Sequence, residues 1–257
     1  MPEKNRVYRA RIEGYTSEGL GVARIDGQAV FVHRALRGED CDVLILKVLK
    51  NAAFGKAVRV YEPSPHRVEP DCPYYGRCGG CDFRHMDRTE ELAAKRQRVQ
   101  DALRRIGGSD VTVEGILSGA PLHYRNKSQY PVAADGSVGF YKARSHQVVP
   151  VTQCLIQKPQ ADAAAQALRT YIASCGVSCY DEKTRRGLVR HLYIRTNGAG
   201  QSLICVVVNG KKLPGEEELV RLLRQAAPET VGVVLGVNTQ PTGAVLGTEY
   251  RLSLIHI

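Results

Sequence analysis

The sequence contains no apolar run approaching the roughly twenty residues that a membrane-spanning helix needs. Its first twenty residues are charged and hold no apolar core segment, so we expect no secretory signal peptide. Because disulfides persist mainly in oxidising compartments, we expect a cytoplasmic protein whose eight cysteines are reduced. Internal repeats and low-complexity segments are also missing, so we expect a globular chain of two or more domains.

Acidic residues are fewer than basic ones. The 257 residues include 36 Lys and Arg against 26 Asp and Glu, which gives a formal net charge of +10. A field of this sign attracts polyanions, and nucleic acid is the usual one. The composition therefore favours a nucleic-acid partner.

Four of the eight cysteines form a pattern. Three are spaced C-x5-C-x2-C with two glycines between the last two, and a fourth stands alone downstream. Thiolates on a tight bend, completed by a remote fourth, are typical of an iron–sulfur cluster. Structural zinc remains an alternative, although zinc ribbons usually pair two C-x2-C motifs. We predict a closed centre, structural or redox-sensing, whose ligands are Cys72, Cys78, Cys81 and Cys154.

The other cysteines give weaker signals. Cys41 and Cys205 lie in apolar, strand-like runs, where a thiol usually behaves as a small buried hydrophobe. Cys175 and Cys179 form a C-x3-C pair with no histidine nearby. We expect the first two in the core and assign no metal to the second two.

The first part of the chain alternates polar and apolar residues in five short runs within 6–62. Strands at this spacing predict a small closed barrel of the OB type, which commonly offers a basic, aromatic face to single-stranded nucleic acid. The alternative is a barrel that serves only as a packed structural domain and binds no nucleic acid. A helix is expected over 87–106, with Thr89 as N-cap and an apolar face. That face comprises Leu92, Val99, Leu103 and Ile106.

Beyond Pro121 the pattern alternates strands with two helices, over 159–175 and 215–227, and predicts a hairpin around Asp135 and Gly136. Hairpins with two covering helices favour an antiparallel α+β domain. The predicted organisation is a barrel (1–63), a cysteine segment (64–86), a linking helix (87–120), a central domain (121–252) and a non-native tail (253–257).

Several segments together resemble one family. EGLGVARIDGQAVFVHRALRGED, PDCPYYGRCGGCDFRH, HYRNKSQYPV and TQCLIQ occur in the order seen in bacterial RNA uracil-5 methyltransferases that carry a TRAM domain and a [4Fe-4S] cluster. The resemblance implies a TRAM barrel at the N-terminus. It also implies cluster ligation by the same four cysteines that the spacing indicates.

Members of that family also have a Rossmann-like domain that binds S-adenosylmethionine and supplies a Cys-Asn-Pro nucleophile. In this sequence no Gly-rich loop links a strand to a helix in the required way, and none of the eight cysteines precedes Asn-Pro. The expected fold class is therefore α+β multi-domain: an OB-like (TRAM) barrel, a cluster-binding segment and an antiparallel central domain, with the C-terminal Rossmann-like domain absent. We expect a truncated, inactive chain without catalytic or S-adenosylmethionine-binding residues.

The resemblance implies the RNA-binding, iron–sulfur part of an enzyme that forms 5-methyluridine in ribosomal RNA, 23S rRNA in particular, and that is monomeric at full length. A transfer RNA enzyme and a non-enzymatic TRAM-type RNA-binding protein are the alternatives. Arginine presents a fork of donors to phosphate, and a histidine can also donate. The residues predicted to contact RNA are Arg125, Lys127, Lys142, Arg144 and His146.

Overall fold

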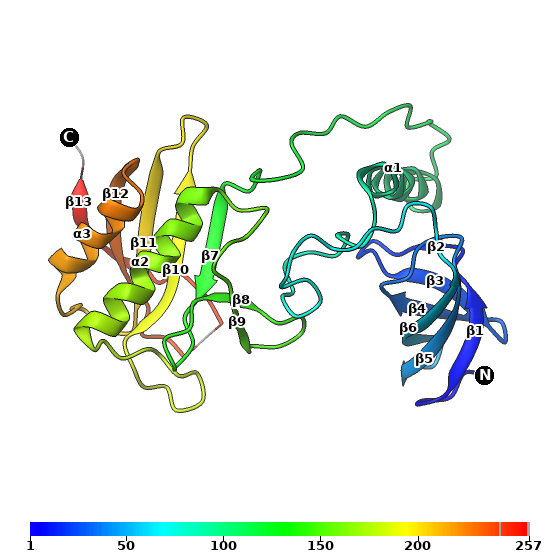
Figure 1. The fold of residues 1–257 in the computed structure, drawn as a ribbon, viewed down its shortest axis with the longest axis horizontal. Coiled ribbons are helices and arrows are strands. Elements are labelled where there is room, and N and C mark those ends of the chain that lie inside the picture. Colours follow the sequence, from blue (N-terminus) through cyan, green and yellow to red (C-terminus); the bar gives the residue numbers. More distant parts are fainter. Residues whose placement is uncertain (242, 256–257) are drawn as a thin grey trace. The chain divides into compact units, whose positions relative to one another are not determined.

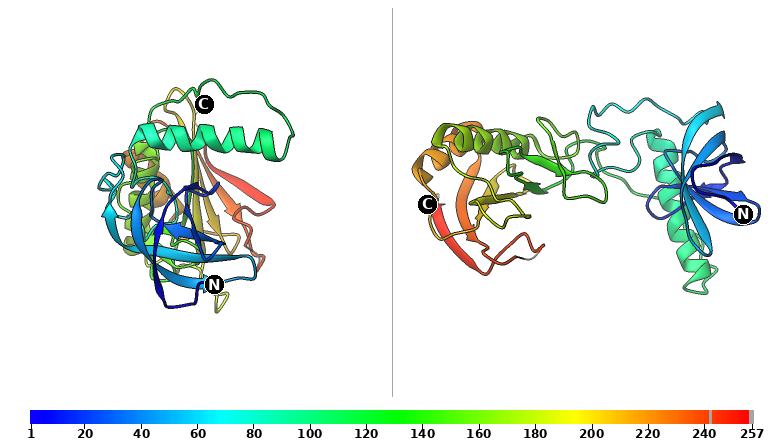
Figure 2. Two further views of the ribbon diagram at one scale, coloured as in Figure 1. Left: turned by 90° about the vertical axis from the view of Figure 1, so that its right-hand side faces the viewer. Right: turned by 90° about the horizontal axis from the view of Figure 1, so that it is seen from below.

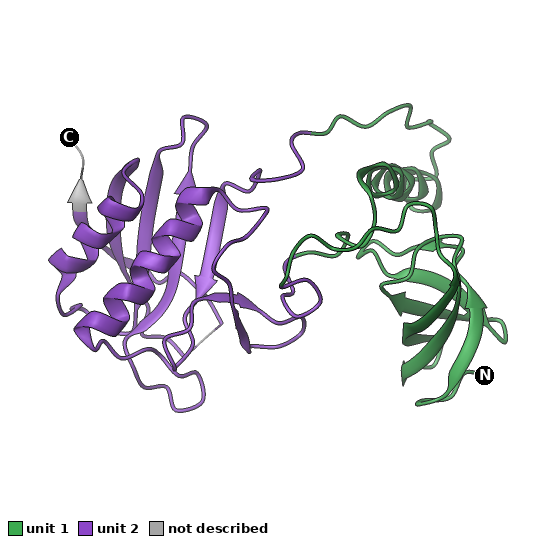
Figure 3. Ribbon diagram, viewed as in Figure 1, with its two compact units in different colours: residues 1–73, 81–118 green, residues 74–80, 119–257 purple. Residues whose placement is uncertain are grey.

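A computed structural model describes residues 1–241 and 243–255, and its elements are labelled in Figure 1. The chain forms two compact units (Figure 3). The barrel unit contains residues 1–73 and 81–118, and the sheet unit contains residues 74–80 together with the chain from 119 onward. A short piece of the cysteine segment thus belongs to the sheet unit, while the residues on both sides of it belong to the barrel unit.

The barrel unit contains a six-stranded sheet in the order β1-β5-β6-β4-β3-β2. Neighbouring strands are antiparallel except β4 and β6, which are parallel. Alternation along the strands turns Val30, Val32, Val43 and Ile45 fully inward. All five predicted strands are present, with β2 in addition: β1 (Val7–Arg11), β2 (Gly14–Tyr15), β3 (Gly21–Ile25), β4 (Gln28–His33), β5 (Asp40–Val48) and β6 (Ala52–Glu62).

A buried ion pair fixes the chain where it leaves the barrel. Glu39 is fully buried, and its carboxylate accepts hydrogen bonds from Arg67 Nε at 2.5 Å and Nη2 at 2.7 Å. The same carboxylate accepts from Leu36 N at 2.8 Å and Ser64 N at 3.2 Å. Burial alone would raise the pKa of Glu39, but these hydrogen bonds outweigh it and the pKa is lowered. Glu39 is therefore a buried carboxylate whose charge depends on Arg67.

Helix α1 (Arg88–Arg105) is attached to the barrel through its first turn. Its N-cap is Asp87, which accepts a hydrogen bond from Glu90 N at 2.9 Å, so the predicted cap Thr89 is wrong. The Glu90 carboxylate is buried and accepts from Tyr15 Oη at 2.8 Å and Arg37 Nη2 at 3.1 Å. These contacts hold the N-terminal turn within the barrel unit.

The apolar side chains in the rest of α1 are largely exposed to solvent or only half-buried. Val99 is 50% exposed and Ile106, just beyond the helix, is 88% exposed, while Leu92 and Leu103 are half-buried. The predicted apolar face is thus only partly packed within the barrel unit. No helix in the described part of the chain has the length and apolar character needed to cross a membrane.

The sheet unit contains a five-stranded sheet in the order β13-β12-β11-β10-β7. Helices α2 (Pro159–Cys175) and α3 (Glu216–Ala226) lie on one face, and no described helix lies on the other (Figures 1 and 2). Leu192, Ile194 and Ile204 are fully buried in one apolar cluster with Leu168 of α2 and Leu223 of α3. The strands are β7 (Lys127–Pro131), β10 (Val189–Thr196), β11 (Ser202–Val208), β12 (Thr230–Val237) and β13 (Glu249–Ile255), with a separate pair β8 (Gly139–Tyr141) and β9 (Val148–Pro150).

The fold class predicted for this unit is wrong. β11 and β12 run parallel, joined through α3, so the sheet is mixed and not antiparallel. A helical crossover returns the chain in its original direction, and this permits a parallel pair. The predicted hairpin around Asp135 and Gly136 is present as a tight turn, in which Gly136 N donates to Ala133 O at 2.9 Å. Only one antiparallel bridge, between Val132 and Val138, joins its two arms, because β7 pairs with β10 and β8 with β9.

Strand β13 pairs antiparallel with β12, with Leu252 opposite Val234. The segment predicted as a non-native tail, residues 253–257, begins inside this strand. Its last two residues lie outside the described residues.

Candidate nucleic-acid interface and cysteine sites

Cys78 lies in a stretch that folds onto the β8–β9 pair of the sheet unit. Cys78 forms a β-bridge with Lys142, and Gly79 N donates to Tyr141 O at 2.9 Å. A Cβ at Gly79 would lie 2.9 Å from the backbone of Ala143, so this close approach requires glycine. The glycine next to the predicted ligand is thus needed for packing within this unit.

Cys154 is also held in the sheet unit, by a buried carboxylate. Cys154 N donates to Asp162 Oδ2 at 2.7 Å, and Tyr130 Oη donates to Asp162 Oδ1 at 2.8 Å. Burial raises the pKa of Asp162, and these two hydrogen bonds offset only part of that rise. The backbone at Cys154 is therefore fixed, while its side chain is half-buried.

Cys72 and Cys81 lie in the barrel unit, near one guanidinium. Arg84 Nε donates to Asp71 Oδ1 at 2.6 Å, and Nη2 donates to the second carboxylate oxygen. The hydrogen bond to Asp71 raises the pKa of Arg84, and the thiols of Cys81 and Cys72 add to this effect. His85 is buried, and burial lowers its pKa to about 4, which favours the neutral imidazole at physiological pH.

The four predicted metal ligands are thus divided equally between the units. All four side chains are half-buried, and soft thiols are donors suited to iron–sulfur clusters or zinc. In residues 1–241 and 243–255, no three His, Cys, Asp or Glu side chains gather as a metal site. The shared ligand set of Cys72, Cys78, Cys81 and Cys154 stays a prediction from spacing.

Two other cysteines lie where the sequence placed them. Cys41 is fully buried and Cys205 is 7% exposed, which confirms the core prediction. Burial raises the pKa of each thiol to about 11. Both are therefore protonated and unreactive at neutral pH.

Three of the predicted RNA contacts lie in the turn between β8 and β9. Lys142, Arg144 and His146 are all exposed, and Arg144 has a left-handed backbone with φ of 56°. His146 Nδ1 lies 2.8 Å from Glu182 Oε2, and its ring contacts Tyr141 at 5.3 Å between centroids. The predicted RNA contact His146 is therefore already engaged by a carboxylate.

The other two predicted contacts lie at the edge strand β7. Arg125 is exposed and forms a β-bridge with Gln157, just before the strand. Lys127 begins the strand and is paired directly with Arg195 of β10. Paired residues in an antiparallel ladder point to the same face, so Arg195 extends this basic edge. Arg195 is not among the residues predicted from the sequence to contact RNA.

The barrel unit carries a further basic and aromatic surface that the sequence analysis did not resolve into residues. Phe31 of β4 and Phe54 of β6 are paired in register, with ring centroids 5.3 Å apart. Lys47 is paired with Phe54, and Lys56 follows Phe54 on the same side of β6. We call Phe31, Lys47, Phe54 and Lys56 the barrel face. Its signal is the polar and apolar alternation in QAVFVH and AAFGKA.

Residues 3–58 match the TRAM domain model. Among curated proteins, this chain is 41% identical over 252 residues to an uncharacterized RNA methyltransferase of Clostridium tetani, covering 96% of this chain and 55% of that protein. It is 40% identical to another from Caldanaerobacter subterraneus, covering 94% of this chain and 55% of that protein. The chain therefore spans about half the length of the curated relatives that it matches.

Among solved structures, the chain resembles the Pyrococcus abyssi tRNA (uracil-54, C5)-methyltransferase in complex with S-adenosyl-L-homocysteine. The TM-score is 0.71 at 19% identity, over 96% of this chain and 54% of that one, which shows a shared fold. This likeness overturns the part of the predicted fold class that declared a Rossmann-like domain absent. A truncated, inactive chain is not supported.

Proposed function

We propose that this protein is an S-adenosylmethionine-dependent RNA methyltransferase acting on carbon 5 of uracil, and that the described residues hold the RNA. The names of the relatives from Clostridium tetani and Caldanaerobacter subterraneus support RNA methylation. The Pyrococcus abyssi structure supports uracil C5 as the target atom. The observation that carries the RNA-binding role is the barrel face inside the region that matches the TRAM model.

The barrel face has the chemistry of a single-strand binder. Two phenylalanine rings side by side offer π-faces on which bases stack regardless of sequence. Lys47 and Lys56 flank them, and neither forms an ion pair within the described residues. Ammonium groups beside stacked bases can neutralise the phosphates that join those bases.

A methyltransferase that modifies a base within folded RNA must draw that base out of its stack, which requires a grip on the flanking nucleotides. S-adenosylmethionine would supply the methyl group. The residues described here would fix the RNA backbone while the base is displaced. Candidates for this grip are Arg125, Lys127, Lys142 and Arg144, with His146 as a donor once it leaves Glu182.

Ribosomal RNA, in particular 23S rRNA in the cytoplasm, is the substrate that we propose. Transfer RNA is the second candidate, because the solved structure of the same fold is a tRNA (uracil-54, C5)-methyltransferase. Mapping 5-methyluridine in RNA from cells with and without the gene decides between them. We expect loss of one 5-methyluridine from 23S rRNA. Loss from transfer RNA alone would move the enzyme to the second substrate, and unchanged 5-methyluridine in both RNAs would rule out the activity.

We further propose that Cys72, Cys78, Cys81 and Cys154 ligate a [4Fe-4S] cluster, as their spacing indicates. Protein purified without oxygen should contain about four irons per chain and absorb visible light. Cys78→Ser or Cys154→Ser should remove the iron, whereas Cys205→Ser, at a buried core thiol, should retain it. Colourless protein with stoichiometric zinc would contradict the cluster.

The barrel face is tested by binding of the wild-type chain to a fluorescent single-stranded oligoribonucleotide. Phe31→Ala with Phe54→Ala should weaken binding by roughly 10-fold or more, since stacking contributes about 1–3 kcal/mol per base. Val58→Ala, an exposed apolar residue elsewhere on β6, is the matched control and should bind like wild type. Equal affinity of the double variant would remove the barrel face from the account.

A further inference from the structure

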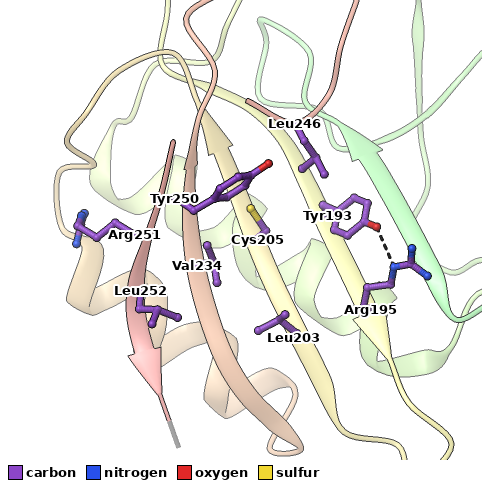
Figure 4. Close-up of a pocket in the computed structure, with 9 residues that line it drawn as sticks. All are labelled: Tyr193, Arg195, Leu203, Cys205, Val234, Leu246, Tyr250, Arg251 and Leu252. Carbon is purple, nitrogen blue, oxygen red and sulfur yellow. Dashed lines mark hydrogen bonds between the residues drawn. The ribbon is translucent and has the colours of Figure 1, made fainter. Parts of the chain in front are cut away.

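The helix-free face of the five-stranded sheet contains an open groove of about 470 Å³ (Figure 4). Side chains from β10 to β13 and from the segment before β13 line it. Leu203, Tyr250 and Leu252 are 45%, 52% and 56% exposed there. Large apolar side chains gathered in one exposed hollow are typical of a binding surface.

Cations border this groove on the side of β7. Arg195 lines the groove and is paired with Lys127 of β7 on one side and with Leu203 of β11 on the other. These three neighbouring side chains therefore form a row with two cations at one end and an apolar residue at the other. Arg195 Nε donates to Tyr193 Oη at 2.8 Å, and the guanidinium carbon lies 5.8 Å from the Tyr193 ring centroid. Within the described residues, neither Arg195 nor Lys127 forms an ion pair. Two cations therefore remain available to an anionic ligand beside an aromatic ring.

We propose that this groove binds a single-stranded segment of RNA, with a base against Tyr193 and the adjoining phosphate on Arg195 and Lys127. The inference rests on the proposed function and adds a second RNA-binding surface, on the sheet unit. A base has an apolar, polarisable face that stacks on tyrosine, and its phosphate accepts the parallel hydrogen bonds of a guanidinium fork. The Nε hydrogen bond to Tyr193 leaves the terminal nitrogens of Arg195 for that fork.

Charge argues against a second copy of this chain as the occupant. Each copy carries a formal charge of +10, so association brings like-charged molecules together. The remaining cation in the groove, Arg251, is already paired with Glu216. Because the unpaired cations stand at one border of an apolar floor, the surface complements a ligand with one anionic and one flat apolar side.

The described residues that line the groove suit binding of a ligand and offer neither an ionised nucleophile nor a general base. Its thiol, Cys205, is buried and has its pKa raised to about 11, so it remains neutral. The Tyr250 hydroxyl donates to Gly247 O at 2.6 Å, which leaves its ring toward the groove. Among the described residues, the side chains that line the groove include no carboxylate and no imidazole that could act as a general base.

The test measures binding of the full chain to a 5′-fluorescein oligouridylate and to the same oligomer with abasic residues. Tyr193→Ala should weaken binding of the intact oligomer by roughly 5- to 150-fold, the range for loss of one stacked base. Tyr193→Phe keeps the ring and should stay within about threefold of wild type. Arg195→Ala should lower the salt slope by about 0.7, whereas Arg224→Ala, on the helix-covered side, should leave it unchanged.

The outcomes separate this inference from the function that it rests on. If the wild-type chain binds and Tyr193→Ala binds equally well, the groove assignment is wrong and the proposed function survives. If abasic RNA binds as tightly as intact RNA, base stacking fails both in the groove and on the barrel face. If the wild-type chain binds neither oligomer, both fail. A dimer in sedimentation that Leu252→Glu converts to monomer would assign the groove to a second copy and overturn the inference.

Discussion

The barrel unit and the sheet unit are each stabilised internally by a different kind of interaction. The twelve largest fully buried side chains of the described residues include three from the barrel unit and nine from the sheet unit. The barrel unit adds to its three, Ile12, Leu36 and Ile45, a fully buried carboxylate on Glu39 that is paired with Arg67. A small barrel with a limited apolar core therefore depends on one buried ion pair, whereas the sheet unit depends on apolar packing between its sheet and two helices.

The comparison predicts the largest effect for Arg67→Ala. The change leaves Glu39 buried without its cation, which typically costs roughly 3–5 kcal/mol, and it should unfold the barrel unit first. Hydrogen exchange followed by mass spectrometry would locate the loss in peptides from 7–62. Arg9→Ala, which breaks an exposed ion pair with Asp40, is the control and should change little. If Arg67→Ala lowered protection from hydrogen exchange equally in both units, the barrel unit would not depend on this ion pair more than the sheet unit does.

Leu192→Ala is the corresponding test in the sheet unit. Leu192 is fully buried in the cluster beneath α2 and α3, and removing such a side chain typically costs about 2–5 kcal/mol. The same exchange measurement should show the loss in β10 and β11 while the barrel strands keep their protection. Faster exchange in the barrel unit would show that the units do not unfold separately.

Acid should distinguish the units below about pH 4.5. The folded pKa of Glu39 is lowered, so its stabilisation is present above the unfolded value of 4.5 and is lost as pH falls through the folded pKa. The folded pKa of Asp162 is raised, so its contribution is present below the unfolded value of 3.8 and is lost as pH rises through the folded pKa. Burial lowers the pKa of His85 in the barrel unit and of His191 in the sheet unit to about 4. These two histidines therefore destabilise both units to a similar extent as pH falls from 6.5 to 4.

We therefore expect the barrel unit to lose protection first when pH falls from 4.5 to 3, and Glu39→Gln to flatten that dependence. Circular dichroism combined with exchange at each pH measures it. Earlier loss of the sheet unit would reverse the assignment of the two carboxylates.

The smallest effect is expected at the end of α1. Ile106 is 88% exposed, so Ile106→Gln should change the free energy of unfolding by less than about 0.5 kcal/mol. Urea unfolding gives the value, with Leu192→Ala as the contrasting case. A loss above 1 kcal/mol would mean that Ile106 is covered in solution.

The sequence predicted the bounds of a helix or strand well where a single residue type marked its start or its end. Proline near the start and glycine at the end gave α2 its observed bounds, Pro159–Cys175. The cap of α1 was misplaced because Asp87 and Thr89 are both good N-cap residues, and only the contact from Glu90 N selects Asp87. The parallel pairing of β11 and β12 was missed although a strand, a helix and an apolar strand follow one another, a pattern typical of a crossover.

The surfaces were harder to predict than the elements. Phe31 and Phe54 are brought together by a parallel pairing of strands that are not consecutive, and spacing along the sequence does not indicate it. In β10, alternation separates Tyr193 and Arg195 from Leu192 and Ile194, but only the packing of α2 and α3 decides which set is buried. Sequence therefore indicated basic residues, and the fold arranged them beside aromatic rings.

The salt dependence of RNA binding by the wild-type chain tests the central claim most directly. If the described residues hold RNA through its phosphates, the logarithm of the binding constant should fall linearly with the logarithm of salt concentration. Each phosphate contact adds roughly 0.7 to 0.9 to the slope, so four contacts predict a slope of about −3 on single-stranded RNA. Arg125→Ala with Lys127→Ala should make it shallower. An affinity that does not change with salt would contradict the account.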